Sequence, residues 1–164
     1  MNKAFLKFPI ISLSLLLAFS CSEEDESDPK VWRGASTVFT KEDGADWTNS
    51  ENQDHITDDV WITRADNRGI FNIALEPSYT NVFSPVGTTW AFGSIDGYRE
   101  LNYSDWESTI LEEFGTGGVP EIVNQEMVLH LLEEDVYISI TFLSWSIGAP
   151  DQELGGFSYR RSTE

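Results

Sequence analysis

Residues 127–145, MVLHLLEEDVYISITFLSW, decide the fold of this chain. Every second residue from Val136 to Phe142 is apolar, and this period of two predicts a β-strand with one apolar face. The preceding run, 127–132, is apolar on both faces except for His130, which is typical of a central strand. The acidic residues 133–135 lie between the two runs and form the turn. The stretch therefore predicts a hairpin in the middle of a sheet, with Leu129 and Leu131 packed beside the apolar face.

The rest of the chain from Val31 onward follows the same pattern of short apolar runs and turn residues. One helix is expected over 105–113, with Ser104 as its N-cap and Gly115 as its end. Roughly seven or eight short strands favour an all-β fold, an antiparallel two-sheet sandwich that is jelly-roll-like, with a closed barrel as the second choice. Besides the hairpin, the predicted strands are 37–40, 60–64, 69–74, 88–92 and 155–160.

The N-terminus has the features of a secretory signal peptide. A start with two lysines precedes the apolar run 8–19, which is too short to cross a bilayer of about 30 Å. Residues 17–21, LAFSC, resemble a bacterial lipobox, and this resemblance implies that Cys21 is acylated and becomes the new N-terminus. Ala18 and Ser20 also fit ordinary signal cleavage, which is the alternative. We therefore expect a lipoprotein signal peptide (1–20), an acidic tether (21–30) and a single β-sandwich domain (31–164).

The tether holds a run of acids, SEEDESD at 22–28. Such a run is a solvated spacer that keeps a domain away from a surface. A cysteine, a serine and then acids also resemble the export signal of surface lipoproteins in the Bacteroidetes. The resemblance implies an outer-membrane protein, anchored to the membrane at Cys21 and displayed on the cell surface, with a periplasm-facing orientation as the alternative.

The composition excludes several classes of protein. The 164 residues include 28 Asp+Glu and 10 Lys+Arg, for a net charge of −18. Nucleic acids require a basic face, so we expect no nucleic-acid partner. The single cysteine excludes a disulfide scaffold and a cysteine-ligated zinc site.

Several segments together resemble a C-terminal signature of secreted and lipid-anchored bacterial β-domains of uncharacterised function. The signature residues here are HLL (130–132), DVYI (135–138), FLSW (142–145) and GGFSYRR (155–161), and residues 52–64 are similar to its upstream half. The resemblance implies no activity, so no catalytic residue is carried over from it.

Aromatic and acidic residues supply the candidate sites. Exposed tryptophans bind sugar rings or partner proteins, but small sandwiches also use tryptophan in the core. Trp47 and Trp106 lie outside the predicted strands, so we expect them to be exposed and to bind a ligand. The tryptophans inside strands are expected in the core: Trp61, Trp90 and Trp145.

A cluster of acids precedes the first predicted hairpin. Calcium takes six to eight oxygen ligands, and Asp54, Asp58 and Asp59 are its candidate ligands here, against the alternative of a solvated acidic loop. No other cofactor is expected. The two histidines are too few for a three-histidine zinc site, and His130 is expected to be a core or sheet-face histidine with a satisfied hydrogen bond.

These observations favour a non-catalytic binding or structural module of the cell envelope, with a glycan or a protein as its ligand. The alternative is a small envelope hydrolase that acts on polysaccharide through paired carboxylates. Aromatic residues that line a flat face would favour the first function, and exposed carboxylates that face each other across a concave groove would favour the second.

Overall fold

A computed structural model describes residues 28–66, 68–147 and 154–164. The larger sheet contains β1 (Lys30–Trp32), β2 (Thr37–Lys41), β6 (Thr88–Phe92), β7 (Glu126–Leu131), β8 (Val136–Trp145) and β9 (Phe157–Arg161). The smaller sheet contains β3 (Asp54–His55), β4 (Trp61–Arg64) and β5 (Ile70–Asn72). The helices are α1 (Trp106–Phe114) and the short 3-10 helices η1 (Ser50–Asn52), η2 (Ile95–Gly97) and η3 (Val119–Ile122). The predicted signal peptide, Cys21 and all but the end of the acidic tether lie outside the described residues.

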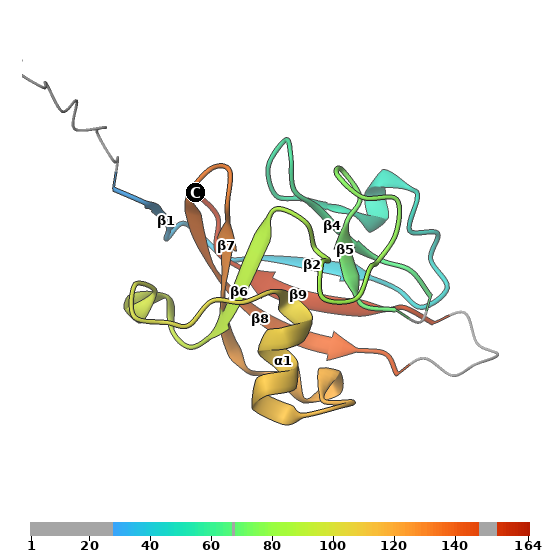
Figure 1. Cartoon of the computed structure of the whole chain (residues 1–164). Helices are drawn as coiled ribbons and strands as arrows, with labels where there is room; N and C mark the ends of the chain where they lie inside the picture. The colour runs from blue at the N-terminus through green and yellow to red at the C-terminus, as the bar shows by residue number, and fades with distance from the viewer. Residues whose placement is uncertain (1–27, 67, 148–153) are drawn as a thin grey trace, which may run out of the picture.

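The two sheets form a sandwich (Figure 1). Strand order in the larger sheet is β2-β9-β8-β7-β6, all antiparallel, and β1 adds a short parallel pairing to β8. The smaller sheet is the antiparallel meander β3-β4-β5. The predicted antiparallel two-sheet sandwich with one short helix is therefore confirmed, and the described part of the chain contains no closed barrel.

The β7–β8 hairpin is central, as its sequence predicts. β7 pairs with β6 on one side and with β8 on the other, and Leu129 lies opposite Ile138. The alternate residues of β8 from Val136 to Phe142 are at most 3 % exposed. They share one core cluster with Ile62 of the smaller sheet, so apolar contact between the sheets holds the sandwich together.

Helix α1 begins one residue later than the capping prediction places it. Asp105, not Ser104, is the N-cap, and its carboxylate accepts a hydrogen bond from the Ser108 N–H at 2.9 Å. Ser104 instead exchanges two backbone hydrogen bonds with Trp90 of β6. Because those bonds need an extended backbone, they hold Ser104 outside the helix. Gly115 ends the helix with a positive φ of 73°, as predicted.

Among residues 28–66, 68–147 and 154–164, no helix has the length and apolar character needed to cross a bilayer.

Candidate functional site

The structure places Trp106 in the core, so the prediction that it is exposed is wrong. Its side chain is 1 % exposed, and its ring lies 5.4 Å from that of Trp145. The physical reason is the helix start at Trp106, which directs this side chain and that of Ile110, one turn later, toward the sheet. The indole Nε1 is buried and has no hydrogen-bond partner among the described residues.

Trp47 is half-buried and makes an edge contact with Phe71 at a centroid distance of 5.5 Å. Its carbonyl accepts a hydrogen bond from the Gln53 side chain. Trp47 is thus partly exposed, but it does not line either of the cavities described below.

The predicted calcium ligand Asp54 is engaged in an ion pair. Its carboxylate accepts hydrogen bonds from Arg161 Nε at 2.7 Å and Nη2 at 2.9 Å, and from the Tyr159 hydroxyl at 2.7 Å. The pair is buried and joins β3 of the smaller sheet to β9 of the larger one. Asp58 and Asp59 are exposed, and across the described ranges no three His, Cys, Asp or Glu side chains form a group that could hold a metal ion.

His130 lies on the outer face of the larger sheet and is satisfied, as expected. Its Nε2 lies 2.9 Å from the Asp135 carboxylate, and its ring stacks on Tyr137 at 4.0 Å. Tyr103 meets the same ring edge-on. These contacts account for the histidine in the β7–β8 hairpin without a catalytic role.

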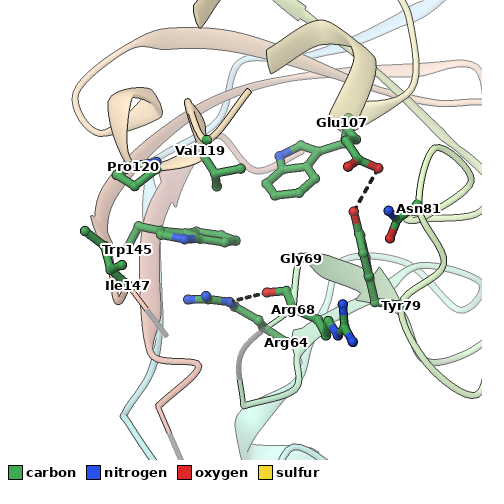
Figure 2. A pocket seen from close by; sticks show the side chains of 12 residues that line it. Arg64, Arg68, Gly69, Tyr79, Asn81, Glu107, Val119, Pro120, Trp145 and Ile147 are labelled. Atoms are coloured by element: carbon green, nitrogen blue, oxygen red, sulfur yellow. Dashed lines mark hydrogen bonds between the residues drawn. The ribbon is translucent and has the colours of Figure 1, made fainter. Parts of the chain in front are cut away.

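A cavity of about 340 Å³ lies where the start of α1, the η3 segment, the end of β8 and the β4–β5 turn meet (Figure 2). Its walls combine aromatic and aliphatic side chains with charged and polar ones. The lining residues are Arg64, Arg68, Gly69, Tyr79, Asn81, Trp106, Glu107, Gly117, Val119, Pro120, Trp145 and Ile147.

Gly69 keeps the floor of this cavity open. A Cβ at this position would lie 2.4 Å from Tyr79 Cε2 and 2.8 Å from Trp106 Cζ3. Both distances are shorter than van der Waals contact, so any side chain would displace an aromatic ring. The absent side chain brings the β4–β5 turn against the two rings and leaves the space beside them unfilled.

Arg64 is fixed beneath Trp145. Its guanidinium carbon lies 3.7 Å from the centre of the Trp145 ring, and the residue is 2 % exposed. Its three nitrogens donate to the backbone carbonyls of Arg68, Gly156 and Ser146 at 2.7, 2.9 and 3.0 Å. Burial lowers the pKa of Arg64 to about 10, so the side chain is still cationic at neutral pH.

Glu107 lies at the rim of the cavity opposite Arg64 (Figure 2). Its Oε2 accepts hydrogen bonds from the Tyr79 hydroxyl at 2.9 Å and from the Val82 N–H at 2.8 Å. Val82 has a φ of 58°, a strained conformation for a β-branched residue, and the bond to Glu107 helps to hold it. Burial and the hydrogen bond to Glu107 raise the pKa of Tyr79, so its hydroxyl stays protonated and donates. Asn81 lies beside the Tyr79 ring at this rim (Figure 2).

A second cavity, of about 270 Å³, has a different character. Three exposed glutamates line it, Glu100 together with Glu112 and Glu113 of α1. Its remaining lining residues are Phe92, Leu101, Asn102 and Thr109. This is the place where acidic side chains gather around a concave surface, whereas the first cavity is the aromatic one.

Comparisons with protein-family models, with curated proteins and with solved structures find no match for this chain.

Proposed function

We propose that this chain is a non-catalytic binding module of the cell envelope, and that the aromatic cavity binds one sugar ring of a glycan. The observation that carries the proposal is the division of the cavity wall into an aromatic part, Trp106, Trp145 and Tyr79, and a polar rim with Asn81 and Glu107. A sugar ring has the same division, since its C–H groups are apolar and its hydroxyls are polar. Ligand sites in proteins combine such an apolar wall with a few convergent polar groups.

The indole N–H of Trp106, which has no hydrogen-bond partner in the described part of the chain, supports a ligand at this place. A buried donor without an acceptor costs about 1–3 kcal/mol, and proteins retain few of them. Trp106 lines the cavity, and we propose that an acceptor of the bound ligand, directly or through a water molecule, pairs with this N–H. Trp106 therefore remains a candidate ligand-binding residue, as part of a cavity wall and not as an exposed platform.

The polar groups of the cavity favour binding over hydrolysis. Glu107 is the one carboxylate among the lining residues that the structure describes, and it already accepts hydrogen bonds from Tyr79 and Val82. A glycosidase requires two carboxylates about 5–10 Å apart across the scissile bond. The alternative, a small envelope hydrolase, would use the second cavity, which Glu100, Glu112 and Glu113 line.

The anchoring part of the proposal rests on the sequence. An acylated Cys21 followed by the acids of the tether would hold the domain at the outer membrane and present it at the cell surface. Many anchored copies on one cell give avidity, so weak binding at each cavity is sufficient for adhesion to a polymer.

The test is binding of the purified full-length chain to a panel of polysaccharides, with the asparagines of the two cavities exchanged in parallel. Asn81 and Asn102 are both exposed, and each lines one cavity. We expect Asn81→Ala to weaken binding about three- to tenfold, the effect of one hydrogen bond, and Asn102→Ala to leave it unchanged.

Three outcomes would contradict the proposal. Loss of binding only in Asn102→Ala would move the site to the acidic cavity. Loss only in Trp47→Ala would move the site to the segment between β2 and η1, where Trp47 contacts Phe71 of the smaller sheet. Release of reducing ends from any polysaccharide, abolished by Glu112→Gln or Glu100→Gln, would establish the hydrolase instead.

A further inference from the structure

The arginines of this chain divide into two groups. Arg33, Arg99 and Arg161 each form an ion pair with an aspartate. In the described part of the chain, Arg64, Arg68 and Arg160 have no carboxylate within ion-pair distance. The chain has 28 Asp+Glu and 10 Lys+Arg, so an arginine without an acid partner is unusual in it. Two of these three arginines, Arg64 and Arg68, line the aromatic cavity.

Within residues 28–66, 68–147 and 154–164, no carboxylate lies within ion-pair distance of the Arg64 guanidinium. Its bonds go to backbone carbonyls, which satisfy N–H groups and carry no net charge. Asp43 attracts the guanidinium only at longer range, and the Oδ1 of Asp43 accepts the Gly156 N–H at 2.8 Å. Burial lowers the pKa of the neighbouring Lys41, and the positive charge of Arg64 lowers it further. Arg64 is therefore cationic at the floor of the cavity at neutral pH, and Asp43 attracts it only at longer range.

Arg68 brings a second, accessible guanidinium to the same cavity. The residue is exposed, and its backbone carbonyl accepts the 2.7 Å hydrogen bond from Arg64 Nε. Through this bond the buried Arg64 side chain holds the backbone of the exposed Arg68 in place. Figure 2 shows both residues on the side of the cavity opposite Glu107. With two arginines and one glutamate, the described lining residues have a formal charge of +1, opposite in sign to the whole chain.

We infer that the sugar bound in the aromatic cavity is an acidic one, a hexuronic acid unit whose carboxylate pairs with Arg68 above the buried charge of Arg64. This inference rests on the proposed glycan-binding function. The planar guanidinium presents parallel N–H groups that match the two oxygens of a carboxylate. The hydroxyls of the same sugar meet Asn81 and Glu107 at the opposite rim, so the charged group and the hydroxyls fix the orientation of the ring.

The experiment compares oligosaccharides that differ only in charge. The full-length chain is titrated with oligomers of galacturonate, glucuronate and mannuronate, with their methyl esters, with neutral oligomers of the parent hexoses, and with sulfated galactan oligomers. We expect at least one uronate to bind about tenfold more tightly than its methyl ester. This preference should decrease as salt is raised from 50 to about 300 mM, because the ion pair is partly exposed.

Two variants with equal charge provide the matched control. Arg68→Gln should abolish the preference for acid over ester, while Arg160→Gln, which removes an exposed arginine outside the cavity, should leave it unchanged. Equal binding of acids and esters would overturn the acidic-sugar inference and leave the glycan proposal standing. Sulfated galactan binding as tightly as the uronates would overturn the carboxylate assignment. If no saccharide of the panel binds, the proposed function itself fails.

Discussion

Replacing Asp54 with asparagine should destabilise the sandwich severely. The Asp54 carboxylate is the acceptor for Arg161 through two nitrogens and for the Tyr159 hydroxyl, and both side chains of the ion pair are at most 10 % exposed. Asparagine keeps nearly the same volume but removes the negative charge. Arg161 is then left cationic and buried without a counter-charge. The NH₂ of the asparagine takes the place of one carboxylate oxygen, so a donor faces a donor there.

The size of the effect follows from these contacts. Breaking one partner out of a buried, hydrogen-bonded ion pair costs about 3–5 kcal/mol. A domain of this size has a free energy of unfolding of about 5–15 kcal/mol, so the loss is a large share of the total. Tyr159→Phe removes one hydrogen bond to a charged acceptor and leaves the ion pair intact, and it should cost about 1.5–3 kcal/mol.

Urea unfolding followed by tryptophan fluorescence measures these differences, because Trp90 and Trp106 are buried in the native core. Asp58→Asn is the matched control: Asp58 is exposed, so the same substitution there should change the free energy of unfolding by less than about 0.5 kcal/mol. A cost below about 1 kcal/mol for Asp54→Asn would refute the reasoning that this pair joins the sheets.

Three further predictions concern the core, alkaline pH and the membrane anchor. Ile138→Ala should lower the free energy of unfolding by about 2–5 kcal/mol in the same urea assay, because Ile138 is fully buried; a cost near that of a surface substitution would contradict its place in the core. Burial, reinforced by the negative charge of Asp54, raises the pKa of Tyr159. Because the folded pKa exceeds the unfolded value of about 10, this stabilisation is complete below pH 10 and is lost above it by up to about 1.4 kcal/mol per pH unit, which urea titrations from pH 8 to 11 would detect. Cys21→Ala should move the protein from the detergent phase to the aqueous phase in phase partitioning, and a variant that stays in the detergent would contradict lipidation.

The elements that the sequence predicts correctly are those whose signal is local. The alternation from Val136 to Phe142 identifies both the strand and its buried face, because side chains alternate across a sheet. Trp106 has a comparable local signal: it stands four residues before Ile110, and positions i and i+4 share one helix face, which here faces the core. The Ser104 cap failed for a different reason, since its backbone pairs with Trp90, a contact that no local pattern encodes.

The cavity could not be predicted from local patterns. Its lining comes from the β4–β5 turn, the segment after β5, the start of α1, the η3 segment and the end of β8, and only the fold brings these together. Asp54 and its partner Arg161 are 107 positions apart in the chain. The local sequence around Asp54 does not indicate this ion pair, and it therefore suggests a calcium ligand. Gly69 is the partial exception, because an isolated glycine at the start of a strand indicates a close approach of backbone to another group.

The position of β9 sets the order in which this domain can assemble. It is the last strand in the described sequence, yet it lies inside the larger sheet, between β2 and β8. A polypeptide synthesised or exported from its N-terminus exposes β2 long before Thr37 can meet its partner Arg161. Until then β2 has no neighbour in the sheet, and β8 is unpaired along the edge that β9 will cover. Completion of the larger sheet is therefore a late step in folding, because it requires β9. Before that step the unpaired edges of β2 and β8 can pair with strands of other chains.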